Sequence, residues 1–188
     1  PGNAQDGCLR RRVWPRPETQ GSLVIYGLDD AKAVRTMSDL AARPGEITGL
    51  AHLSGDGKSA QTFVRVEGGA SSVDIQLRSL CEILSVPSEF LDEVVSTTLW
   101  RQLRELDKLN PRPDEVLWRF TQPASESVAL IEALRPLGLD RRALDWAGSL
   151  LWALLPATTE AGVLHQVARR HNGQAWRFAT NPEDLNDE

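Results

Sequence analysis

The chain has 188 residues, of which 41% are hydrophobic and 25% are charged, with a formal net charge of −5 at pH 7. This composition fits a folded α+β domain that can bury on the order of 70% of its unfolded surface. The negative charge argues against nucleic-acid binding, which needs a concentrated basic surface. No apolar run approaches the roughly 20 residues of a transmembrane helix, and two cysteines do not indicate a disulfide scaffold or a metal site.

The first half of the chain alternates strand-like and helix-like patterns. The expected elements are a strand at 23–26, a helix from Asp29 to about Ala42, strands at 46–53 and 62–66, and a helix over 73–84. Asp29 is a favourable N-cap, and the last helix has apolar residues at helical spacing. A fourth strand near 83–86 is expected to be short or absent because Pro87 follows it. A further helix, from Ser88 to about Asp107, leads to a candidate hinge at 110–113.

The second half carries the tripeptide Trp-Arg-Phe twice, at 118–120 and 176–178. Between the copies we expect a helix at 125–135, a hairpin of strands at 143–146 and 150–155, and a helix that ends at Asn172-Gly173. Strand, helix, two strands, helix and strand in this order predict a ferredoxin-like split βαβ unit. Its first and last strands are antiparallel neighbours, so the two Trp-Arg-Phe strands should lie side by side.

The first half shows the same order of elements, which indicates an internal duplication. We therefore predict an α+β fold of two ferredoxin-like (βαββαβ) halves, with antiparallel sheets and helices on one side. The first half and its linker helix would span 21–110. The second half and an acidic tail would span 111–188.

Alternation along each Trp-Arg-Phe strand puts a ring on one face and a guanidinium on the other. Three tryptophans are expected in the core beneath the helices: Trp118, Trp146 and Trp176. Arg119 and Arg177 should then lie close together on the open face of the sheet, with Asp145 beside them.

The candidate substrate-binding residues are Arg119, Arg177, His52 and Asp145. Two nearby guanidiniums could hold a carboxylate or a flavin phosphate, because their planar forks match such anions. Alternatively, the arginines pair with acidic neighbours such as Asp145, as surface arginines commonly do. His52 could orient a substrate or take a proton, or it could be a structural histidine at a strand end or an interface.

Several motifs of known chemistry are missing from the sequence. The run Gly55-Asp-Gly-Lys58 lacks the spacing of a phosphate-binding loop, and Gly68-Gly69 lacks the dinucleotide-binding pattern. The three histidines do not have metal-ligand spacing, and no serine or cysteine can be matched to a histidine for nucleophilic catalysis. We therefore expect no FAD and no metal to bind to this chain alone, and we name no catalytic residue.

Four phrases in a fixed order nevertheless resemble a known family. Leu9-Arg-Arg-Arg-Val-Trp-Pro-Arg-Pro-Glu18, with the following Ser22-Leu-Val-Ile-Tyr-Gly-Leu-Asp-Asp-Ala31, is similar to the exit from the flavin domain of FAD-linked oxidases. The other phrases are Glu-Ile-Thr-Gly-Leu-Ala-His-Leu at 46–53, Val-Leu-Trp-Arg at 116–119 and Asp-Trp-Ala-Gly-Ser-Leu-Leu-Trp at 145–152. Together they resemble the FAD-binding subunit of bacterial glycolate oxidase over nearly the whole chain.

The resemblance implies the C-terminal cap domain of a flavin-dependent 2-hydroxy acid oxidase, a domain with a duplicated ferredoxin-like fold. Residues 1–20 would be the exit from a missing flavin domain, which binds the FAD. The implied partners are that domain, a second flavin subunit, an iron–sulfur subunit and a substrate such as glycolate. The implied location is cytoplasmic, peripheral to the inner side of the cell membrane through these subunits. The isolated cap is expected to be inactive.

Two other functions remain open from the sequence. A duplicated ferredoxin-like sensor or binding module could hold a carboxylate or an amino acid between its halves without a flavin. An RNA-binding module of the same topology would need exposed aromatic residues on its central strands. The expected open-face residues are instead Arg65, Arg119, Asp145 and Arg177, so we predict no nucleic-acid partner.

Overall fold

The structure is a computed structural model that describes residues 17–43, 45, 47–55, 58–84 and 86–178. Residues 1–16, which are most of the expected exit segment, lie outside this range. Residues 179–188, which contain the acidic tail, also lie outside it. The described strands are β1 (Thr19–Tyr26), β2 (Ile47–Gly55), β3 (Lys58–Gly68), β4 (Ser88–Leu91), β5 (Glu115–Thr121), β6 (Arg142–Asp145), β7 (Leu150–Pro156) and β8 (Gln174–Phe178). The described α-helices are α1 (Asp30–Ala41), α2 (Ala70–Leu84), α3 (Glu93–Arg104), α4 (Ser127–Leu134) and α5 (Ala161–Arg170). Short 3₁₀ turns are η1 (Asp107–Leu109), η2 (Ala124–Glu126), η3 (Arg135–Leu137) and η4 (Trp146–Gly148).

The strands form one antiparallel sheet in the order β4-β1-β3-β2-β6-β7-β5-β8. The first four strands make one half and the last four make the other, and β2 pairs with β6 where the halves meet. Read from its outer edge towards this joint, each half has its fourth, first, third and second strands in that order. The α+β class is confirmed, but one continuous sheet replaces the separate sheets that we expected.

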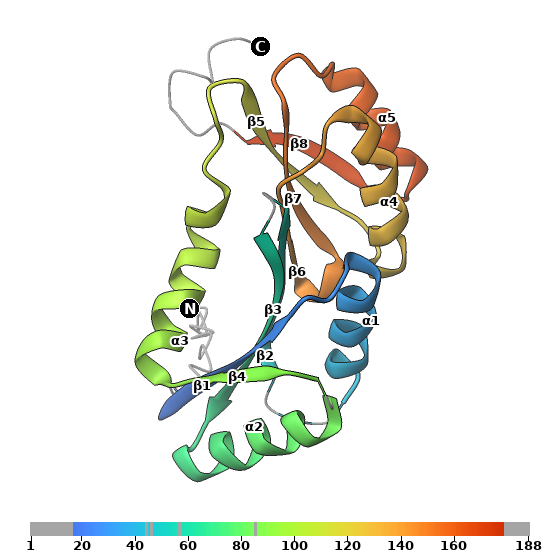
Figure 1. Ribbon diagram of the computed structural model, residues 1–188. Helices are drawn as coiled ribbons and strands as arrows, with labels where there is room; N and C mark the ends of the chain where they lie inside the picture. The colour runs from blue at the N-terminus through green and yellow to red at the C-terminus, as the bar shows by residue number, and fades with distance from the viewer. Residues whose placement is uncertain (1–16, 44, 46, 56–57, 85, 179–188) are drawn as a thin grey trace, which may run out of the picture.

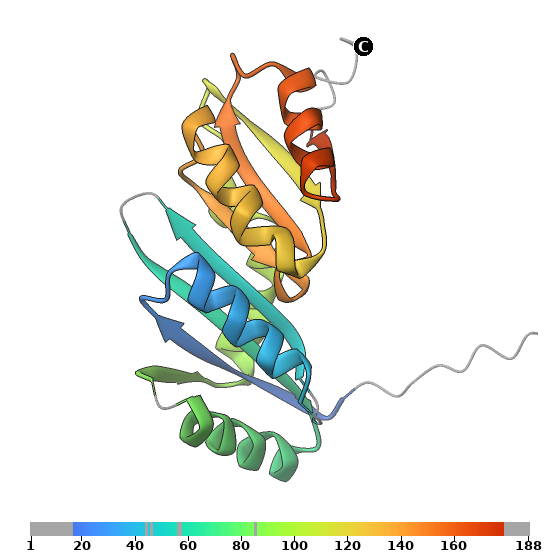
Figure 2. The same cartoon turned by 90° about the vertical axis from the view of Figure 1, so that its right-hand side faces the viewer.

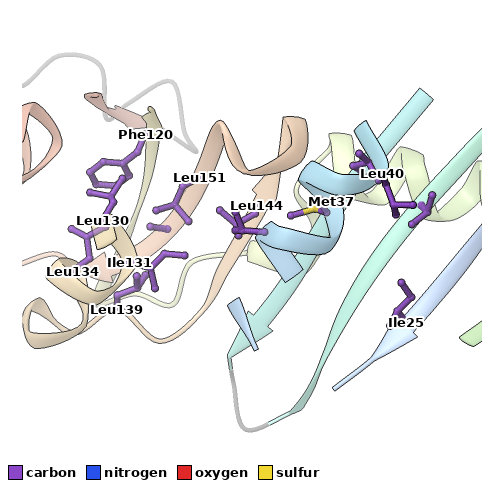
Figure 3. Packing of buried hydrophobic residues seen from close by; sticks show 14 of the residues in the cluster. Ile25, Met37, Leu40, Phe120, Leu130, Ile131, Leu134, Leu139, Leu144 and Leu151 are labelled. Atoms are coloured by element: carbon purple, nitrogen blue, oxygen red, sulfur yellow. The ribbon is translucent and has the colours of Figure 1, made fainter. Parts of the chain in front are cut away.

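Helices α1, α2, α4 and α5 cover one face of the sheet, and α3 lies on the other face (Figures 1 and 2). The main hydrophobic core lies under the four helices and runs through both halves. Figure 3 follows it from Phe120 and Leu130 past Leu144, on β6, to Met37 and Leu40 of α1. Fully burying a side chain of this kind contributes about 1.5–3 kcal/mol. A smaller cluster packs α3 against β1, β2 and β3.

The segment before α3 differs from the sequence-based expectation. Asp29 caps α1 as predicted, with 2.8 Å between its Oδ1 and the Lys32 amide that donates to it. Residues 88–91, however, do not begin the linker helix; they form edge strand β4, paired with β1. Asp92 ends this strand and starts α3, because its carboxylate accepts a hydrogen bond from the Val95 amide. The fourth strand of the first half is therefore present, a few residues later than expected.

The two Trp-Arg-Phe strands, β5 and β8, are antiparallel neighbours as predicted, but their faces are not those expected. Trp118 lies opposite Arg177, and Arg119 lies opposite Trp176. Opposed residues of an antiparallel pair point to the same face. Trp118 is 3% exposed and packs under the helices, where its ring meets that of His165 on α5. Trp176 is 44% exposed and lies on the face of Arg119, so its predicted core position was wrong.

We expect this difference to appear in stability. Replacing Trp118 with Ala should lower the free energy of unfolding by about 3–5 kcal/mol, as truncation of a large core residue does. Trp176→Ala, made in the equivalent position of the second tripeptide, should cost much less because the side chain is half exposed. Chemical denaturation of both variants measures the difference; equal losses would contradict the assigned faces.

A buried ion pair joins the halves beneath α1. Asp30, the first residue of α1, accepts a hydrogen bond from Arg142 of β6, with 2.6 Å between Oδ2 and Nη2. Nη2 of Arg135 lies 3.0 Å from the same oxygen. His52 of β2 is 1% exposed at this place, with Nδ1 2.9 Å from Thr62 Oγ1 and Nε2 3.6 Å from Asp30 Oδ1. His52 thus belongs to the joint between the halves, on the face covered by α1.

Burial by itself raises the pKa of Asp30, but the neighbouring His52 ring and Arg142 guanidinium outweigh it and hold the pKa well below its usual range. The unfolded carboxyl titrates near pH 3.9. A lowered folded pKa means that the contribution of Asp30 to stability is present above about pH 4 and is lost as the pH falls towards the folded value.

Asp30→Asn should therefore destabilise the protein by about 3–5 kcal/mol at pH 7, because it leaves the Arg142 charge buried without its partner. The difference from wild type should shrink below about pH 4. Asp29→Asn is the matched control: Asn is an equally good N-cap, and this exposed change should stay within about 0.5 kcal/mol. Urea denaturation at several pH values tests both variants, and a neutral Asp30→Asn would exclude the proposed role of the pair.

Candidate functional site

A groove of about 810 Å³ lies on the sheet face that carries α3. It crosses the joint, so that both halves and the linker helix contribute side chains. Its lining includes Gln20, Thr48, Arg65, Glu67, Trp100, Arg104, Arg119, Asp145, Trp146 and Trp152. The lining thus combines guanidiniums, two carboxylates and three indoles.

Arg119 lies at the centre of an aromatic cluster in this groove. Its guanidinium carbon is 5.9 Å from the ring centre of Trp146, 5.8 Å from that of Trp152 and 5.7 Å from that of Trp176. Trp152 and Trp176 are its direct neighbours on β7 and β8, opposite Arg119 in both pairings. Each such cation–π contact contributes about 0.5–2 kcal/mol. The strand register thus surrounds one arginine with indole rings.

The hydrogen-bonding capacity of Arg119 is not used by the described residues. Its Nε is buried and has no hydrogen-bond partner among them, and the carboxylates that line the groove form no ion pair with it in this part of the structure. A buried unpaired donor costs about 1–3 kcal/mol. The guanidinium is therefore held by ring contacts, and its Nε–H is a donor that the described residues leave unsatisfied.

Arg65 has a different role, although it lines the same groove. Its Nε donates to Thr48 Oγ1 and its Nη2 donates to the Thr48 carbonyl oxygen, each at 3.2 Å. The guanidinium also stacks over Trp100 of α3, 4.8 Å from the ring centre, and pairs with Glu67 at 3.5 Å. Trp100 in turn donates from Nε1 to Ser22 Oγ at 2.8 Å. Arg65 therefore holds α3 on the sheet.

Trp146 was expected in the core, but it is 59% exposed. It begins η4, the turn between β6 and β7, and has a φ of 51°; Ala147 and Gly148 follow with φ values of 54° and 99°. A positive φ is rare for a bulky residue and costs on the order of 1–3 kcal/mol. This left-handed path lifts the indole out of the alternation of β6, which is why strand phase failed to place it.

Hydrogen bonds from beneath hold the turn in this conformation. The Gly148 carbonyl oxygen accepts from Gln122 Nε2 at 2.8 Å and from the Ser127 hydroxyl, both of which are buried. On the groove side, the Trp146 amide donates to Asp145 Oδ1 at 2.7 Å. The turn is thus fixed at both ends, so the exposed position of Trp146 is built into the fold.

Asp145 lies at the groove as predicted, next to this turn. Burial raises the pKa of its carboxyl, while the Trp146 amide and the charge of Arg65 act in the opposite direction. The charged form is therefore less stable in the folded protein than in water.

Of the four predicted site residues, two lie together and the other two lie elsewhere. Arg119 and Asp145 line one groove, whereas His52 lies at the buried joint on the other face. Arg177 is exposed on β8 and points to the helix face with Trp118, so the expected pairing of Arg119 with Arg177 was wrong.

Sequence analysis missed Trp152 as a site residue. Its alternation with the buried Leu151 and Leu155 could have placed it opposite the main core.

The expectation that the open face lacks aromatic residues, on which RNA binding was set aside, was wrong. Aromatic side chains do lie on the open face: Trp152, Trp176 and Phe178 are there with Arg119, and the rings of Trp152 and Phe178 meet edge to face at 5.1 Å. The carboxylates of Glu67 and Asp145 line the same groove. These two carboxylates would oppose a run of phosphates.

Comparison of the chain with models of known protein families found no match, and neither did comparison with curated proteins. Within the described ranges, no group of three or more histidine, cysteine, aspartate or glutamate side chains is placed to hold a metal ion. In the same part of the chain, no helix has both the length and the apolar character needed to cross a membrane.

The raised pKa of Asp145 leads to a prediction. Asp145→Asn should increase the free energy of unfolding at pH 7, because the amide oxygen can still accept from the Trp146 amide without a buried charge. The gain should disappear as the pH falls through about 4, where the wild-type carboxyl becomes neutral in both states. Thermal denaturation from pH 3 to pH 7 follows this change. A loss of stability at pH 7 would mean that the charge of Asp145 is favourable in the folded state.

Proposed function

We propose that the chain is the cap domain of a flavin-dependent 2-hydroxy acid oxidase of the glycolate oxidase type, and that its groove receives the substrate. Two of the four phrases that carry the family resemblance, at 116–119 and 145–152, contribute Arg119, Asp145, Trp146 and Trp152. The resemblance lies in the sequence and the groove lies in the folded sheet, so their coincidence supports the proposal.

The proposed ancestry of the fold is a duplicated ferredoxin-like unit divided near 110–113. The equal strand order of the two halves supports it, because the order fourth, first, third, second is that of a split βαβ unit. The helices α1 with α2 and α4 with α5 occupy matching places on one face (Figure 2). In this interpretation β2 and β6 are the equivalent edge strands through which the halves joined.

The observation that carries the proposed function is the guanidinium of Arg119 at the groove, whose Nε has no hydrogen-bond partner among the described residues. A 2-hydroxy acid presents a planar carboxylate, which matches the N–H groups of an arginine. A hydrogen bond to a charged group contributes about 1.5–3 kcal/mol. The aromatic rings around Arg119 shield the contact from part of the solvent, which strengthens it. In this role Arg119 binds and orients the acid.

The chemistry of oxidation would come from FAD, as the acceptor of the electrons, bound by a separate flavin domain. The described residues offer Arg119 on the substrate side and no glycine-rich loop for a pyrophosphate, so we assign the cofactor to that partner domain. A second flavin subunit and an iron–sulfur subunit complete the proposed assembly. Through them the protein would work in the cytoplasm, peripheral to the inner side of the cell membrane.

The test compares Arg119→Met with Arg177→Met in the chain produced together with its flavin domain and partner subunits. The assembly should contain flavin and should reduce a dye when glycolate is added. Arg119→Met should lower kcat/KM at least about tenfold, because about 1.4 kcal/mol of lost binding is a factor of ten and a charge-assisted bond is worth more. Arg177→Met, on the opposite face, should stay within about twofold.

Two results would contradict the proposal in different ways. An assembly without flavin, or one that oxidises no 2-hydroxy acid, would exclude the oxidase assignment. A fully active Arg119→Met would remove Arg119 from the substrate site. Melting temperatures of both variants, measured on the isolated chain, show whether each variant is folded.

One observation favours a second candidate, a small-molecule sensor or binding module with no flavin. The groove is closed on one side by α3 of the same chain, so it is formed without another domain. A sensor should bind glycolate or an amino acid by itself and gain melting temperature from it. Co-purification of flavin with the assembled protein argues for the oxidase instead.

A further inference from the structure

We propose that the acid bound by the Arg119 groove carries a planar aromatic ring, and that this ring stacks on Trp146. This inference rests on the proposed function and narrows it, from 2-hydroxy acids in general to aromatic 2-hydroxy acids. It assigns Trp146 as the residue that determines substrate specificity.

The size of the groove is the first argument. Its volume, about 810 Å³, is in the range of pockets that enclose drug-sized ligands, roughly 300–1,000 Å³. Glycolate has only two carbon atoms and would leave most of this space unfilled. A carboxylate held at Arg119 therefore leaves room for a large group on the neighbouring carbon.

The character of the lining is the second argument. The three rings nearest to Arg119 are all indoles, and each lies less than 6 Å from the guanidinium by its ring centre. Stacked rings hold a guanidinium in place and leave its N–H edge for a carboxylate. The outer surface of an exposed indole can then receive a second ring in an offset stack. The site thus combines an anion holder with an aromatic surface.

The third argument is the conformation of Trp146, which distinguishes it from the other two indoles around Arg119. It has the largest exposed fraction, 59% against 44% for Trp176, and Trp152 is only partly exposed. The left-handed turn that presents it is unfavourable for a tryptophan and is kept in place by buried hydrogen bonds to Gly148. Strain of this kind is concentrated at ligand-binding sites. An exposed, strained indole beside a guanidinium with an unsatisfied Nε is explained if a ligand covers it.

The experiment measures the binding of three acids to the chain by calorimetry, and kcat/KM for the same acids in the assembled oxidase. The acids are mandelate, which has a phenyl ring, hexahydromandelate, which has a saturated ring of the same carbon number, and glycolate. Wild type should prefer mandelate to each of the others by at least about tenfold. The saturated ring separates stacking from simple filling of space.

Two variants of Trp146 complete the test. Trp146→Asn should lose the preference for mandelate, so that the ratio of mandelate binding to glycolate binding falls at least about tenfold from that of wild type. Because Asn tolerates a positive φ, this variant should fold and melt no lower than wild type. Trp146→Phe keeps a ring and should keep most of the preference.

The outcomes separate the inference from the proposed function. Equal use of mandelate and hexahydromandelate, or a preference that survives Trp146→Asn, would overturn the role of Trp146 while leaving Arg119-dependent oxidation of glycolate intact. If neither the chain nor the assembly takes any of the three acids, both the inference and the proposed function are wrong.

Discussion

The pairing of β2 with β6 is the interaction on which the rest of the structure depends. It spans only three residue pairs, from His52 opposite Leu144 to Ser54 opposite Arg142. Through it two four-stranded halves become one sheet, and Arg65 and Thr48 of the first half come to line the same groove as Arg119 and Trp146 of the second. A shift of this pairing by one residue would turn every side chain of one half to the opposite face.

The ion pair between Asp30 and Arg142 gives this short pairing a defined register. The Arg142 side chain reaches Asp30 of α1 only when β6 shows this residue to the helix face. A buried pair contributes little net stability compared with apolar packing. We therefore interpret the pair chiefly as a device that specifies how the halves join. The continuous core, including Leu144 beside α1, supplies most of the stability of the joint (Figure 3).

Sequence patterns predicted most helices and strands, because apolar spacing and the Asp29 cap reflect local forces. They also predicted that the two Trp-Arg-Phe strands are neighbours. They did not predict the face of Trp176, because the register of β5 and β8 depends on the packing of the whole second half. They missed β4 because its pairing with β1 is a tertiary contact, and they misplaced Trp146 because its left-handed turn is fixed by Gln122 and Ser127, which are distant from it in sequence.

The candidate site could likewise be predicted only in part. Arg119 and Asp145 could be named from strand alternation, but the indoles that hold Arg119 come together only in the folded sheet. The most direct measurement of the central claim is the NMR signal of the Arg119 Nε–H group during titration of the chain with 2-hydroxy acids. We expect this signal to shift in a saturable way, while that of Arg177 stays in place. A saturable shift at Arg177, or none at Arg119 when an acid binds, would contradict the account.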